Sequence, residues 1–125
     1  LVSQLGIDTH FLDPITHMKI TTQGFSEVVR QIKHLAPKKW LAVGGGGYDI
    51  SAVARAWALA YGVMLGEKWN DQIPNEYSKK YGIDFLADEN PPSIDSGTKS
   101  KALDFAKKTI DEIHQKVFQV HSLSF

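Results

Sequence analysis

Apolar and polar residues follow one another along the chain in a pattern that predicts two strands and three helices. The first five residues read as a short strand. Apolar positions then recur three and four residues apart over residues 22–36, which predicts an amphipathic helix, and Pro37 lies just beyond it as a stop signal. The apolar run over residues 40–43 predicts a buried strand.

Two more helices are predicted further along the chain. One covers residues 51–65, with Ser51 as its N-cap and Gly66 as its C-terminal stop. Its apolar residues cover most of the helix circumference, which predicts burial on more than one side. A last amphipathic helix is predicted over residues 99–120, where apolar residues again alternate at spacings of three and four. Residues 68–97 show no such spacing and are predicted to be irregular.

The order strand, helix, strand, helix predicts a parallel α/β layer. A sheet of two strands is too small for this many helices, because parallel strands are usually covered by helices on both faces. We therefore expect a piece of a longer chain that holds most of the sheet. The lack of an initiator methionine and the start inside an apolar segment favour this interpretation over a trimmed, disordered N-terminus.

Composition excludes several classes of protein. Lys+Arg and Asp+Glu both number 14, and the resulting net charge of zero argues against a nucleic-acid binder. No apolar run reaches the length of a membrane span, and the first residues lack the basic segment of a signal peptide. Because the chain has no cysteine, any metal must be held by His, Asp or Glu. We expect a cytoplasmic location.

Four consecutive glycines, Gly44 to Gly47, separate the second strand from the next helix, and Tyr48 follows them. Such a run indicates a sharp turn or a close approach to the backbone, because ordering glycine costs more entropy than ordering any other residue. A nucleotide-binding loop is disfavoured, since both the third glycine of the dinucleotide fingerprint and a Gly-Lys-Ser/Thr are missing. A tight turn without a ligand stays open. Tyr48 thus lies at the C-terminal end of a predicted strand, and this is the end at which open α/β sheets bind ligands.

The predicted loop over residues 6–22 carries Asp8, His10, Asp13 and His17. An Asp-x-His pair on an extended segment is compatible with metal binding, because both side chains point the same way. A solvated turn is the commoner explanation of such a loop, and an aspartate before a proline is a frequent turn starter. We expect His10 and His17 to be exposed or to lie at the rim of a site.

Taken together, these segments resemble the C-terminal part of the zinc-dependent histone deacetylase family, which has the arginase/deacetylase fold. The branch most similar is that of the bacterial acetoin-utilisation deacetylases. The matching segments are Gly6-Ile7-Asp8-Thr9, Asp13-Pro14, Leu41-Ala42-Val43-Gly44-Gly45-Gly46-Gly47-Tyr48, Val53-Ala54-Arg55-Ala56-Trp57, Ile73-Pro74-Asn75 and Tyr81-Gly82-Ile83-Asp84-Phe85. The resemblance implies that residues 1–125 form the C-terminal portion of a single three-layer α/β/α domain with a parallel sheet.

The resemblance also implies roles for single residues. Asp8 takes the position of one zinc ligand. Tyr48 takes the position of the catalytic tyrosine that hydrogen-bonds the acetyl carbonyl oxygen. Gly46 and Gly47 line the narrow tube that admits the substrate, and Pro14 belongs to a loop at its rim. The implied reaction is the hydrolysis of an acetyl-lysine amide, with an acetylated protein or a small acetylated amine as substrate.

The sequence departs from a complete enzyme of this family. The upstream zinc-binding Asp and His, and the paired histidines that act as general base and acid, have no counterpart in these residues. Because a catalytic zinc site needs three protein ligands, we expect this chain alone to bind zinc weakly and to be inactive. A truncated, non-catalytic homologue that acts as a binding module is the alternative. An exposed sheet edge would make self-association plausible.

Two further residues of the helix after the glycines invite a structural interpretation. Arg55 lies among apolar residues and must find an acceptor, so we expect it to tie its helix to neighbouring loops. Trp57 is expected to pack in the core.

Overall fold

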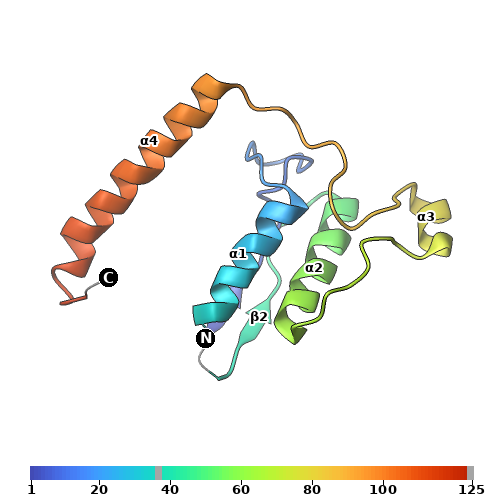
Figure 1. Cartoon of the computed structure of the whole chain (residues 1–125), viewed down its shortest axis with the longest axis horizontal. Helices are drawn as coiled ribbons and strands as arrows, with labels where there is room; N and C mark the ends of the chain where they lie inside the picture. The colour runs from blue at the N-terminus through green and yellow to red at the C-terminus, as the bar shows by residue number, and fades with distance from the viewer. Residues whose placement is uncertain (36–37, 124–125) are drawn as a thin grey trace. The chain divides into compact units, whose positions relative to one another are not determined.

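The computed structural model describes residues 1–35 and 38–123, and the chain divides between Pro92 and Ser93 into two compact units. The elements of the first unit are β1 (Val2–Gln4), α1 (Thr22–Leu35), β2 (Leu41–Val43), α2 (Ile50–Leu65) and α3 (Asn75–Tyr81), shown in Figure 1. The second unit holds α4 (Ser96–Ile113), which continues as the π-helical turn η1 (His114–Phe118). Within the described part of the chain, no helix combines the length and apolar character needed to cross a membrane.

The two strands pair in parallel, as predicted, with Ser3 opposite Ala42 at the centre of the register. Backbone pairing continues beyond the strand ends: the Leu5 amide donates to the Val43 carbonyl at 2.8 Å, and the Ile7 amide donates to the Gly46 carbonyl at 2.7 Å. The segments that follow β1 and β2 therefore run side by side at the C-terminal edge of the sheet.

Helices α1 and α2 pack against each other and enclose the core. Its buried residues are Leu5, Ile7, Phe25, Val29, Ala56 and Ala60. Two of these residues come from the segment after β1, so the same segment that leads into the candidate site is anchored in the core. The apolar side chains on the other face of the strand pair are exposed, Val2 to 71% and Leu41 to 58%.

Asp49, and not Ser51, is the N-cap of α2, so this prediction was wrong. The Asp49 backbone is extended, and its carboxylate accepts hydrogen bonds from the Ala52 amide at 2.8 Å and from the Ser51 hydroxyl at 2.7 Å. Ser51 thus lies inside the first turn and supports the cap. At the other end Gly66 adopts φ +80°, which confirms it as the stop.

Replacing Asp49 with alanine is expected to lower the free energy of unfolding by about 1 kcal/mol, because the first turn of α2 loses its side-chain acceptor. Urea unfolding followed by circular dichroism measures this change. Ser51→Ala is the matched control and removes only the hydroxyl that supports the cap. A Ser51→Ala loss larger than that of Asp49→Ala would contradict the assignment of the cap.

Burial of α2 on more than one side was predicted, and the structure does not bear this out. Ala52, Ala56 and Ala60 are buried along one stripe, whereas Ile50 is 84% exposed and Tyr61 56%. Trp57 is 40% exposed and donates from its ring nitrogen to the Leu5 carbonyl at 2.8 Å, so it is not a core residue. Helix α1 and the two strands cannot cover so many apolar side chains.

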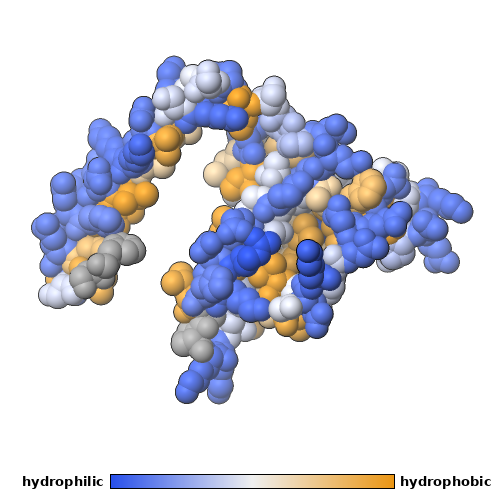
Figure 2. Space-filling model, in the orientation of Figure 1, coloured by the Kyte–Doolittle hydropathy of each residue, from blue (hydrophilic) through white to orange (hydrophobic). Residues whose placement is uncertain are grey.

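The remaining helices differ from the prediction at their boundaries. Helix α1 has the predicted start, but Pro37 lies outside the described residues. Residues 68–97 are mostly irregular, as expected, except for α3, a short helix that buries no residue. Helix α4 begins three residues earlier than predicted, since Asp95 caps it by accepting from the Thr98 amide at 2.9 Å. Figure 2 shows apolar side chains gathered along one side of α4.

Candidate functional site

The candidate site is built where the segments after β1 and β2 meet. Asp8 follows the first strand and Gly46 follows the second, and the Ile7–Gly46 backbone hydrogen bond brings them together. A Cβ atom at Gly46 would overlap the Asp8 carboxylate and would lie 2.7 Å from its Cγ atom. Position 46 must therefore be glycine for the Asp8 side chain to lie where it does. The close approach predicted from the glycine run is made by this carboxylate.

Gly47 turns the chain between β2 and α2. Its φ of +145° is a backbone conformation that side-chain-bearing residues rarely adopt. A Cβ atom there would also lie 2.7 Å from the Cγ2 methyls of both Ile7 and Val53. The turn places the next residue, Tyr48, with 56% of its surface exposed.

Asp13 fixes the backbone of Tyr48. One of its carboxylate oxygens accepts from the Tyr48 amide at 2.9 Å, and the other accepts from the Ile15 and Thr16 amides at 2.9 and 3.1 Å. The turn predicted at Asp13-Pro14 is confirmed, but Asp13 itself is buried and is not part of a solvated turn. Asp13 thereby links the loop of Pro14 to the residue that carries the candidate hydrogen-bond donor.

Burial raises the pKa of the Asp13 carboxyl, but hydrogen bonds from the Ile15, Thr16 and Tyr48 amides outweigh it and hold the pKa below its usual value. Asp13 is therefore an anion at neutral pH. Each of the three amides donates to a full negative charge, which strengthens these hydrogen bonds.

His10 is completely buried, so the prediction that it would be exposed or at a rim was wrong. Its Nε2 lies 2.9 Å from Asp88 Oδ2, and its Nδ1 accepts from the Leu12 amide at 3.2 Å. An Nδ1 that accepts cannot carry a proton, so the ring holds its hydrogen on Nε2 and donates it to Asp88. His17 is exposed, as predicted.

The chain supplies one candidate metal ligand at this place. No hydrogen bond from a described residue reaches the Asp8 carboxylate, and the residue is partly exposed, so its oxygens are available to a cation. His10 cannot join it, because both ring nitrogens are engaged. Among residues 1–35 and 38–123, no group of three His, Cys, Asp or Glu side chains could hold a metal ion. A catalytic zinc ion needs three protein ligands, so the residues described here do not complete a zinc site.

The structure thus brings together some of the residues singled out in the sequence. Asp8 lies against Gly46, and Tyr48 is tied through Asp13 to the loop in which Pro14 is exposed. Arg55 does tie α2 to a loop, as expected: its Nη1 donates to the Asp88 carboxylate at 2.9 Å.

Sequence reasoning missed Asp88 entirely. This carboxylate contacts both His10 and Arg55, which lie 78 and 33 residues away in sequence. It stands in a segment without periodicity, and no local pattern around it indicates a buried role.

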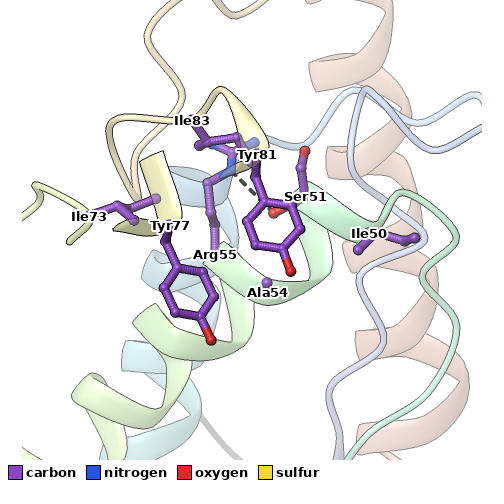
Figure 3. Close-up of a pocket in the computed structure, with 8 residues that line it drawn as sticks. All are labelled: Ile50, Ser51, Ala54, Arg55, Ile73, Tyr77, Tyr81 and Ile83. Atoms are coloured by element: carbon purple, nitrogen blue, oxygen red, sulfur yellow. Dashed lines mark hydrogen bonds between the residues drawn. The ribbon is translucent and has the colours of Figure 1, made fainter. Parts of the chain in front are cut away.

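A separate apolar pocket of about 390 Å³ lies between α2 and α3 (Figure 3). The rings of Tyr77 and Tyr81 line one side of it, with their centroids 5.6 Å apart. Ile50 and Arg55 of α2 line the other side. The pocket includes neither Asp8 nor Tyr48, so it is distinct from the candidate site.

Comparison with known proteins identifies the family. The family model of the histone deacetylase domain matches residues 1–64. The acetoin utilization protein AcuC of Bacillus subtilis is 42% identical over 86 residues, which cover 65% of this chain and 22% of the relative. Histone deacetylase 8 of Danio rerio is 31% identical over 111 residues, which cover 88% of this chain and 29% of the relative.

The fold has a counterpart among solved structures. The crystal structure of an HDAC homolog complexed with SAHA matches with a TM-score of 0.64 at 20% identity, over 85% of this chain and 32% of the other. This likeness confirms the predicted fold class, part of an α/β deacetylase domain.

The chain belongs to the histone deacetylase family. Its similarity to AcuC confirms the acetoin-utilisation branch that the sequence motifs predicted. The chain spans less than a third of the length of the relatives it matches.

Proposed function

We propose that this chain supplies part of the active site of a zinc-dependent deacetylase that hydrolyses the acetyl amide of lysine or of a small acetylated amine. One observation carries the proposal: the close approach of Gly46 to the Asp8 carboxylate, at the same edge of the sheet where Asp13 holds Tyr48. A partly exposed carboxylate and an exposed phenol at one edge suit the binding and polarisation of a small polar group. We further propose that both units belong to the C-terminal part of one deacetylase domain.

The residues of this chain would have distinct tasks in that reaction. Asp8 would provide one ligand to the zinc ion, and the other ligands would come from residues outside this chain. The ion, when bound, supplies a Lewis acid that polarises the amide carbonyl. The Tyr48 hydroxyl would donate a hydrogen bond to the acetyl oxygen and stabilise the negative charge that develops on it as water attacks. Asp13 would hold the backbone from which Tyr48 reaches the substrate.

The test is acetate release from an acetyl-lysine peptide and from an acetylated polyamine by the full-length protein. We expect activity on one of these substrates, its loss after treatment with a chelator, and its return when zinc is added, because the ion supplies the Lewis acid. The same protein treated with chelator and then given magnesium is the control. Failure of the zinc-restored protein to release acetate from either substrate would contradict the proposal and favour a non-catalytic binding module.

A further inference from the structure

Asp88 joins three parts of the first unit that are distant in sequence. Its Oδ2 accepts from the Thr22 amide at 2.7 Å and lies 2.9 Å from His10 Nε2, while its Oδ1 accepts from Arg55 at 2.9 Å. Its side chain is only 3% exposed. Asp88 lies beyond residues 1–64, the segment that the family model matches.

The partners of Asp88 carry the two halves of the candidate site. His10 stands two residues after Asp8 in the loop that follows β1. Arg55 belongs to α2, the helix that begins two residues after Tyr48. A single carboxylate therefore connects the loop of the candidate metal ligand to the helix that follows the candidate hydrogen-bond donor.

Asp88 is itself held in place by its backbone. Its amide donates to the Thr22 hydroxyl at 3.0 Å, and its carbonyl accepts from the Gln23 side chain at 2.8 Å. The carboxylate thus projects from a fixed point at the start of α1. Because the Asp88 backbone is fixed, its two carboxylate oxygens determine where His10 and Arg55 lie relative to each other.

A neutral side chain cannot replace this carboxylate without loss. Burial raises the pKa of Asp88, but hydrogen bonds from Thr22, His10 and Arg55 outweigh it, so the pKa lies below its usual value and the group is an anion. All three partners donate hydrogen atoms. An asparagine would turn an NH₂ group, which also donates, toward at least one of them.

We propose that Asp88 is a positioning residue of the candidate site, which sets the place of Asp8 relative to Tyr48 through its contacts with His10 and Arg55. The proposal rests on the proposed function, because it concerns the metal ligand and the donor named there. A merely structural role is the simplest rival, since buried ion pairs occur without any functional site.

The experiment compares Asp88→Asn with Glu89→Gln in the full-length protein. Glu89 is the neighbouring carboxylate and is exposed, so its replacement controls for the loss of one negative charge in this segment. Groups that orient metal ligands typically contribute 10–100-fold to metal affinity or activity. We expect Asp88→Asn to weaken zinc binding by about 10–100-fold and to lower kcat with little change in KM. Glu89→Gln is expected to leave all three values unchanged.

A second pair of variants protects the test against a misfolded Asp88→Asn. The Nε2 of a glutamine at position 10 can still donate to Asp88, whereas an alanine cannot. We expect His10→Gln to retain zinc affinity and His10→Ala to lose about tenfold or more. Folded Asp88→Asn and His10→Ala proteins that bind zinc as tightly as the unmodified protein would overturn the proposal. So would a lower unfolding midpoint with unchanged zinc affinity.

Hydrogen exchange separates this proposal from the proposed function. If the unmodified protein neither binds zinc nor releases acetate, the proposed function fails, yet the placement of Tyr48 can still be measured. We then expect the Tyr48 amide, which is bound by Asp13, to exchange about tenfold faster in Asp88→Asn than in Glu89→Gln. Equal exchange rates in the two variants would overturn the role of Asp88.

Discussion

Tyr48→Phe in the full-length protein is expected to lower kcat for acetyl-lysine hydrolysis by about 10²–10³-fold, the usual effect of removing one donor to a developing oxyanion. The substitution removes only the hydroxyl. The contact that places the residue, from the Tyr48 amide to Asp13 at 2.9 Å, belongs to the backbone and is retained. Because the lost hydrogen bond strengthens as charge develops on the acetyl oxygen, KM should change much less than kcat.

Tyr61→Phe is the matched control for this prediction. Tyr61 lies in α2 and has the same exposed fraction as Tyr48, 56%, but its ring packs against Trp69, with the ring centroids 5.9 Å apart, and it is not a residue of the candidate site. Steady-state kinetics with an acetyl-lysine peptide measures both variants, and we expect Tyr61→Phe to match the unmodified protein. Full activity of Tyr48→Phe would mean that the tyrosine packs at the surface without taking part in the reaction.

Gly47→Ala is expected to lower the free energy of unfolding by about 2–6 kcal/mol. Two costs add: about 1–3 kcal/mol for a side-chain-bearing residue in a backbone region that is almost confined to glycine, and about 1–3 kcal/mol for forcing a methyl into a packed site. The steric cost arises because the new Cβ would lie 2.7 Å from methyl groups of Ile7 and Val53. Domains of this kind are stable by only about 5–15 kcal/mol, so the variant would lose a large part of its stability.

Gly82→Ala is the control for a glycine at positive φ that has no neighbouring atom in the way. Gly82 ends α3 with φ +66°, and a Cβ atom there would meet nothing within 4 Å. This variant should therefore show the backbone cost alone, about 1–2 kcal/mol. Urea unfolding of both variants gives the comparison. A Gly47→Ala loss no larger than that of Gly82→Ala would show that the contacts with Ile7 and Val53 relax at no cost.

Much of the fold could be predicted because it depends on local patterns. Helices α1, α2 and α4 carry apolar residues at helical spacing over a sufficient length, the two strands are short apolar segments, and Gly66 stops α2 through its own backbone preference. Helix α3 was missed since it buries no residue and so needs no apolar stripe. The cap of α2 was assigned two residues too late, because Asp49 and Ser51 are both good caps and only the backbone conformation distinguishes them.

The candidate site could be predicted only where chain order determines proximity. Asp8 and Gly46 follow adjacent parallel strands, so their approach follows from the sheet. The burial of His10 could not be predicted, because its partner Asp88 lies 78 residues away and no periodic pattern connects them. The turn at Asp13 could be predicted because it is local. The hydrogen bond from the Tyr48 amide to Asp13 could not, because it spans 35 residues.

The glycine run reads like a flexible linker, yet each position abuts a different neighbour. A Cβ atom would meet the Trp57 ring at Gly44, the Gln4 side chain at Gly45, the Asp8 carboxylate at Gly46, and Ile7 and Val53 at Gly47. Over evolutionary time Gly44, Gly46 and Gly47 can therefore change only together with distant partners, and no single partner releases all three. Gly45 is the position most tolerant of substitution, because the long Gln4 side chain can move aside. The aromatic ring next to Gly44 and the β-branched side chains next to Gly47 cannot.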